Sequence, residues 1–139
     1  MRKRVKALSP DDDQIAYNFA VLRVVPHVHT GAFVPVGVIV HARTSEFLDM
    51  RVITNKKELS SRAPGVDVAL LVKYLKSAKA ICQGDEKAGP IALAPPSERF
   101  HWLTSPRSDV IQCGPVHEGL TDDPGAALDS LFRTMIATG

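Results

Sequence analysis

The side chains best suited to binding or catalysis lie close together in the last third of the chain, between Glu98 and Pro124. Arginine offers a planar fork of N–H donors that matches a carboxylate or a phosphate. Histidine gains and loses a proton near neutral pH, and tryptophan offers a flat face on which a base or a cation stacks. The candidate residues of this segment are Arg99, His101, Trp102, Arg107, Ser108, Gln112 and His117.

The same residue types also serve purely structural roles. Trp102 and the neighbouring Phe100 can belong to the core, and Arg107 can bind loop carbonyls without touching a ligand. Ser108 can begin a helix or a strand by bonding to nearby backbone. Residue type and spacing therefore mark residues 98–119 as a candidate recognition surface and leave the structural interpretation open.

Sequence signatures of common enzymes and metal sites are absent. The chain has no glycine-rich phosphate loop, no G-x-S-x-G nucleophile turn and no H-E-x-x-H zinc motif. His27 and His29 form an H-x-H pair that could share zinc with His117, but no ligand spacing supports such a site. Cys82 and Cys113 have no base beside them in the sequence, which argues against a nucleophile. We expect no metal and no cofactor.

Charge and composition exclude several classes of protein. The 139 residues are 45% hydrophobic and 23% charged, as in an ordinary globular domain, and the formal net charge is +2. Residues 1–6 hold four positive charges, so the rest of the chain has a net charge of −2. We therefore expect no domain-wide nucleic-acid surface. Two cysteines are too few for a disulfide-rich secreted scaffold, and no apolar run is long enough for a membrane span or a signal peptide. We expect a cytoplasmic protein.

The sequence predicts one domain that follows a flexible segment. Residues 1–13 join a basic cluster to three aspartates and have no hydrophobic period, which is typical of a flexible terminus. Hydrophobic periodicity begins at residue 14, and neither side of the Gly- and Pro-rich stretch 84–97 is large enough to form a comfortable core alone. We therefore expect a single α+β domain over residues 14–139.

Hydrophobic runs with short polar connections predict an antiparallel meander of about four strands. The expected strands are residues 14–25, 33–42, 46–54 and 108–113. Pro35 cannot donate a hydrogen bond to a neighbouring strand, so it indicates an edge, a bulge or a strand start. Gly37 indicates a bulge or a close approach of backbone.

Apolar residues at helical spacing predict two main helices. The expected helices are residues 66–82 and 124–136. Lys73, Lys76 and Lys79 would form the solvated face of the first helix, or a binding stripe. Asp123 before Pro124 supplies an N-cap and a proline at the first helical position. Because both apolar stripes need cover, we expect the two helices to pack on one face of the sheet.

One long motif and several shorter ones are similar to the conserved pattern of a known protein family. They are Arg99-Phe100-His101-Trp102-Leu103, Pro106-Arg107-Ser108, Gln112, Pro115-Val116-His117, Gly119 and Asp123-Pro124, with Tyr17-Asn18-Phe19-Ala20-Val21-Leu22-Arg23, Val25-Pro26, Phe33, Val34, Gly37-Val38 and Phe47-Leu48. With these residues the chain, from about 15 to 136, resembles the bacterial family called domain of unknown function 3037. Ala32 and Pro35 depart from the acidic residue and asparagine that the family usually has.

The resemblance implies a context and no reaction, because the activity of the family is not established. Its members are small bacterial proteins that are often encoded beside a HipA-like serine/threonine kinase, as in a toxin–antitoxin-like pair. This context implies a non-catalytic accessory or regulatory protein that presents residues 98–119, or a sheet edge, to such a kinase.

The alternative is an enzyme or binding domain directed at a phosphate, a nucleotide or another small anionic molecule. Arg99 and Arg107 would hold the anion, and Trp102 would stack on the ligand. His101 or His117 would move a proton. This reading needs several of these side chains to converge in one open pocket. The balance of features favours a binding protein over an enzyme.

Overall fold

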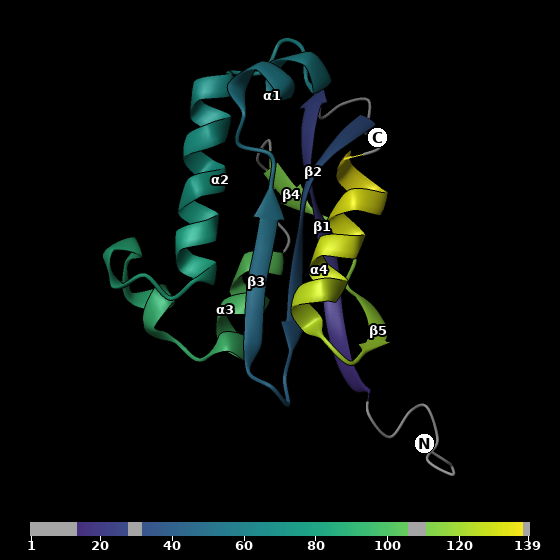
Figure 1. The fold of residues 1–139 in the computed structure, drawn as a ribbon. Coiled ribbons are helices and arrows are strands. Elements are labelled where there is room, and N and C mark those ends of the chain that lie inside the picture. Colours follow the sequence, from purple (N-terminus) through teal and green to yellow (C-terminus); the bar gives the residue numbers. More distant parts are fainter. Residues whose placement is uncertain (1–13, 28–31, 106–110, 138–139) are drawn as a thin grey trace.

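The computed structural model describes residues 14–27, 32–105 and 111–137, and at its centre is a five-stranded antiparallel sheet (Figure 1). Its strands are β1 (Ile15–His27), β2 (Ala32–Ala42), β3 (Phe47–Val52), β4 (Ile111–Cys113) and β5 (His117–Thr121). The strand order is β3-β2-β1-β4, and β5 also pairs with β1. The predicted α+β class and the antiparallel meander of the first three strands are confirmed. The predicted flexible segment, residues 1–13, lies outside the described residues.

Strand β1 is the centre of the sheet because it is long enough to have different partners along its length. One edge pairs with β2. Along the other edge, β5 pairs with the stretch from Ile15 to Phe19 and β4 with the stretch from Leu22 to Val24. The sequence did not predict β5, because most of its side chains are exposed and it has no apolar alternation.

Four α-helices and three short turns lie in the described part of the chain. They are α1 (Lys56–Arg62), α2 (Val68–Cys82), η3 (Glu86–Ala88), η4 (Pro90–Leu93), α3 (Pro96–Thr104), α4 (Pro124–Phe132) and the π-helical turn η5 (Arg133–Ala137). The two predicted helices correspond to α2 and to α4 with η5. As predicted, Asp123 caps α4, and its carboxylate accepts hydrogen bonds from the backbone N–H groups of Gly125 and Ala126. Helices α1 and α3 were not predicted.

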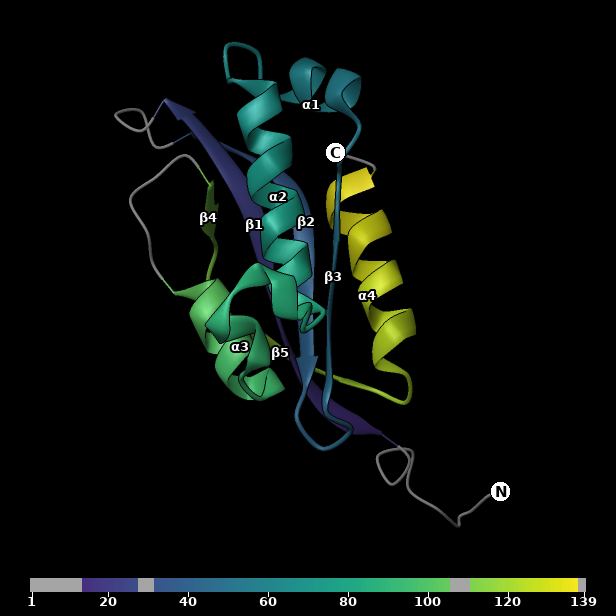
Figure 2. The same ribbon diagram turned by 90° about the vertical axis from the view of Figure 1, so that its left-hand side faces the viewer.

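The helices cover both faces of the sheet. Figure 2 shows α2 and α3 in front of the strands, and Figure 1 shows α4 on the other side. We expected the two predicted helices to pack on one face of the sheet, but α2 and α4 pack on opposite faces. Both faces need cover because β2 is apolar on both sides. Every residue from Val36 to Ala42 is buried, with no alternation between core and solvent. A strand of this kind needs packing partners on each face.

One irregular point of the sheet lies at Pro35, as predicted. Along the β1–β2 pairing, Leu22 lies opposite Gly37 and the next residue, Arg23, lies opposite Pro35. Val36 is therefore the extra residue of a β-bulge. A proline is tolerated here because the bulge interrupts the regular ladder of hydrogen bonds.

Gly37 leaves no room for a side chain. An added β-carbon would lie 2.6 Å from Cγ1 of Val52 and 2.8 Å from the backbone carbonyl oxygen of Arg51. We expect Gly37→Ala to lower the free energy of unfolding by about 1–3 kcal/mol, because β3 must shift to accept the methyl group. Urea denaturation measures this change. Gly125→Ala in α4 is the control, since the nearest atom would be 3.4 Å away. Equal stability of Gly37→Ala and the parent protein would contradict the close approach.

His41 links the stability of the fold to pH. Its ring is 6% exposed and stacks on Phe100 with ring centroids 5.2 Å apart. Burial, and secondly the positive charge of Arg43, lower the pKa of His41 below its usual 6.5. The unfolded chain therefore binds this proton more readily, so stability should fall as the pH drops below about 6.5 and level off below the folded pKa.

Melting temperatures measured through this pH window test the effect of His41. The variant His41→Phe should lose the dependence, because it keeps the stacked ring and removes the titrating group. His101→Gln is the control, since it removes an imidazole from an exposed position. A parent protein and a His41→Phe variant with the same pH profile would contradict this assignment.

Candidate functional site

The predicted site residues lie on three elements. Arg99, His101 and Trp102 belong to α3, Gln112 to β4 and His117 to β5. Arg107 and Ser108 lie outside the residues that the structure describes, as does His29 of the H-x-H pair. The structure brings Trp102 and Gln112 to one cavity and places His117 at another.

Arg99 holds two parts of the chain together. Its Nη1 donates to the carbonyl oxygen of Ala94 at 2.5 Å, and its Nη2 donates to the carbonyl oxygen of Cys82 at 3.4 Å. These bonds connect the end of α2 to the residues that precede α3. The guanidinium group is thus engaged by backbone, which is the structural role that the sequence analysis considered for Arg107.

A groove lies between α2, α3 and β4, and we refer to it as the α2–α3 groove. It has a volume of about 280 Å³. Its lining includes Leu22, Tyr74, Ala78, Ile81, Trp102, Leu103, Ile111, Gln112 and Cys113. Tyr74 is 50% exposed and Trp102 is 38% exposed, so two aromatic side chains remain accessible on different walls of a mainly apolar groove.

The sequence predicted Trp102 as a candidate site residue and did not mark Tyr74. The available signal was a large aromatic residue at position 74, between Lys73 and Lys76 on the solvated side of α2. His101 lies outside the α2–α3 groove. It is exposed and lines a shallow neighbouring cavity of about 370 Å³ together with Glu98 and Trp102.

A second, wider cavity follows another side of α2, and we refer to it as the lysine cleft. Its volume is about 640 Å³ and its lining includes Lys56, Lys73, Lys76, Lys87 and Asp85. Among the described residues, none of these four lysines takes part in an ion pair.

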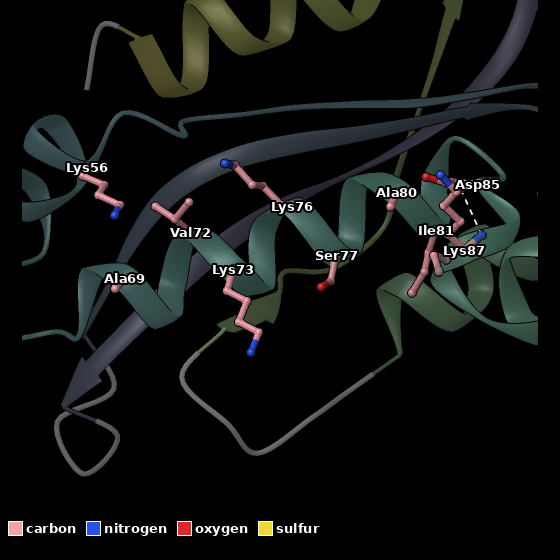
Figure 3. Close-up of a pocket in the computed structure, with 11 residues that line it drawn as sticks. Lys56, Ala69, Val72, Lys73, Lys76, Ser77, Ala80, Ile81, Asp85 and Lys87 are labelled. Atoms are coloured by element: carbon pink, nitrogen blue, oxygen red, sulfur yellow. Dashed lines mark hydrogen bonds between the residues drawn. The ribbon is translucent and has the colours of Figure 1, made fainter.

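The lysines of this cleft do not converge on one point. Figure 3 shows Lys73 and Lys76 leaving α2 in different directions, with Lys56 at one end of the cleft and Lys87 at the other. Lys79, which we had grouped with Lys73 and Lys76, instead donates to the carbonyl oxygen of Met50 at 2.8 Å. The lysine cleft is therefore an extended positive surface and not a compact site for one small anion.

His117 lies on the opposite face of the sheet from α3. Its ring contacts Phe19 with centroids 5.3 Å apart, and it lines a cavity of about 240 Å³ together with Val21 and Arg23. Leu22 lines the α2–α3 groove, and neighbouring residues of a strand point to opposite faces. His101 and His117 therefore do not meet, and they do not form a pair for proton transfer.

The thiol of Cys82 is not activated for catalysis. Burial, and secondly the negative charge of Asp49, raise the pKa of the Cys82 thiol to about 12, so it stays protonated near neutral pH. Cys113 donates from its Sγ to the carbonyl oxygen of Leu103 at 3.3 Å. Over the residues that the structure describes, no three His, Cys, Asp or Glu side chains are grouped to hold a metal ion. Likewise, no helix in these residues is both long and apolar enough to cross a membrane.

The structural role of Arg99 predicts a loss of stability on substitution. Arg99→Met leaves the carbonyl groups of Ala94 and Cys82 without these donors, which should lower the free energy of unfolding by about 1–3 kcal/mol. Urea denaturation measures the change, and His101→Gln on the same helix should change it by less than about 0.5 kcal/mol. If both variants were as stable as the parent protein, the tethering role of Arg99 would be wrong.

Comparison with known proteins places the chain in a family. The family model described as a protein of unknown function (DUF3037) matches residues 19–136. The chain belongs to this family, which confirms the resemblance seen in its motifs. No curated protein and no solved structure gives a match. The function must therefore be argued from the surfaces themselves.

Proposed function

We propose that this DUF3037 protein is a non-catalytic accessory protein that binds a HipA-like serine/threonine kinase through α2 and the cavities beside it. The observation that supports this proposal is the exposure of Tyr74 and Trp102 on the walls of the α2–α3 groove. Aromatic side chains of this kind are enriched among the residues that contribute most to protein–protein binding.

The lining of the α2–α3 groove suits an apolar side chain of the partner. Between its aromatic residues lie Ala78 and Ile81 of α2 and Leu103 of α3. An apolar side chain that enters the groove would leave water and cover these groups, which is favourable in proportion to the area buried. The proposed complex therefore has one apolar anchor from the kinase between Tyr74 and Trp102.

The lysine cleft adds a requirement for negative charge on the partner surface. The lysine cleft and the α2–α3 groove share Ser77 and Ile81, so the two cavities flank the same helix. A partner surface with acidic residues beside its apolar anchor would be complementary to both. Charge complementarity of this kind raises association rates and selects among partners.

The alternative, an enzyme directed at phosphate or a nucleotide, has weaker support. Its residues are divided between two faces, with His101 and Trp102 on one and His117 on the other. Arg99 is engaged by backbone carbonyls. A catalytic base normally needs a second group that orients it, and these histidines do not supply one another with such a group.

Binding to a purified HipA-like serine/threonine kinase tests the proposal. We expect a complex with a dissociation constant in about the micromolar range or below, measured by calorimetry. Trp102→Ala should weaken binding by about tenfold or more, as for a central aromatic contact. Leu120→Ala is the matched control, because Leu120 is 56% exposed on β5 and lies outside the groove. The absence of a complex with the parent protein would refute the proposal.

Charge reversal separates the contribution of the lysine cleft. The double variant Lys73→Glu/Lys76→Glu should slow association by about tenfold and reduce its dependence on salt. Lys57→Glu/Arg133→Glu serves as the control with the same change of net charge, since these exposed residues of α1 and η5 do not line the cleft. Stopped-flow measurements over a range of ionic strength give both quantities. Equal effects of the two changes would assign the result to overall charge and exclude a role of the cleft.

A further inference from the structure

The cavity beside His117 contains a positively charged side chain, Arg23, that the sequence did not mark as a site residue. We refer to this cavity, of about 240 Å³, as the Arg23 pocket. Its lining includes Arg23, Phe33, Pro35, Pro115, His117 and Met135. These residues come from β1, β2, β5, η5 and the residues before β5, and no acidic side chain is among the described residues that line the cavity.

Arg23 differs from a closely matched arginine on the same face. The Cζ atoms of Arg23 and Arg51 each lie 4.5 Å from the centre of a phenylalanine ring, Phe33 and Phe132 respectively. Arg51 also has a counter-ion, because its Nη1 donates to Asp129 at 3.0 Å. Arg23 has no ion pair or hydrogen bond with any residue that the structure describes.

The lack of a partner for Arg23 among the described residues has an energetic cost. Its Nε is shielded from solvent and has no acceptor in the described part of the chain. A guanidinium group stays protonated, so its charge cannot be removed by titration. A polar group that is shielded without a partner destabilises a fold, and such groups are uncommon in native structures. An anion in the pocket would supply the missing negative charge and acceptor atoms.

The surroundings of the guanidinium favour contact along its edge. The ring of Phe33 covers one face of it. A β-carbon at Gly114 would lie 3.5 Å from Nη1 of Arg23, so the glycine keeps larger groups away from that nitrogen. His117, whose ring packs on Phe19, supplies a second side chain that can donate a hydrogen bond at the same cavity.

We propose that the Arg23 pocket binds a small organic anion, with a carboxylate or phosphate head at Arg23 and His117 and a compact apolar body. The head is assigned by the Arg23 guanidinium group, which has no counter-ion among the described residues and matches both kinds of oxyanion. The body is assigned by Phe33, Pro35 and Met135, which make the rest of the lining apolar. This site is separate from the surface proposed for the kinase, because the two lie on opposite faces of the sheet.

Titration of the full chain with benzoate, phenyl phosphate and neutral benzamide, at matched ionic strength, tests the pocket. We expect saturable binding of at least one of the two anions, and none of benzamide. The stronger of the two anions identifies the preferred head. Inorganic phosphate, which has no apolar body, should bind more weakly than phenyl phosphate. If neither anion binds the parent protein saturably, the proposal is wrong.

Two arginine variants separate a ligand-binding role from a structural one. Arg23→Met should weaken binding of the anion by about tenfold or more, because it removes a charge-assisted contact. It should not lower the melting temperature, since it removes a shielded donor that has no acceptor among the described residues. Arg51→Met should show the opposite result, with a lower melting temperature and unchanged binding.

The same two measurements, of anion binding and of melting temperature, can also contradict the proposal. If Arg23→Met bound the anion as the parent protein does, Arg23 would not be the anchor. If it also lowered the melting temperature, Arg23 would have only a structural role. Both measurements are made without the kinase, so failure of the proposed complex would not affect them.

Discussion

The need to cover both faces of β2 determines the arrangement of the molecule. From Val36 to Ala42 the strand has no exposed side, so a layer with helices on one side only would leave half of these residues in water. Helices α2 and α3 cover one face, and α4 with η5 covers the other (Figures 1 and 2). Each face therefore has its own cavity beside its helices, the α2–α3 groove on one face and the Arg23 pocket on the other.

The elements with a strong hydrophobic period could be predicted from the sequence, and the short or exposed elements could not. Helix α2 follows its apolar stripe, with Leu71 and Leu75 buried at helical spacing. In α3 the only buried residue is Phe100, so its nine residues carry no recognisable stripe. Hydrophobic pattern also could not decide which face of the sheet α4 covers, because both faces of β2 are apolar.

The candidate site was predicted in part for a similar reason. Residue type alone identified Trp102 and His117 as groups able to bind a ligand, but their surroundings depend on chain segments distant in sequence. Arg23 shows this limit most clearly. It was visible as a charge within an apolar strand, yet Gly114, His117 and Met135 reach it only through the folded sheet. What a charged residue lacks, such as a counter-ion, is a property of the fold and has no sequence signal.

Strand β1 supplies residues to both cavities from adjacent positions, Leu22 to the α2–α3 groove and Arg23 to the Arg23 pocket. Because alternate side chains point to opposite faces, the two surfaces share a backbone and no side chains. Point substitutions in β1 can thus modify either surface during evolution without changing the other. Insertion or deletion of one residue upstream within the strand would exchange the two sets of side chains, so we infer that selection tolerates replacements in β1 far better than changes in its length.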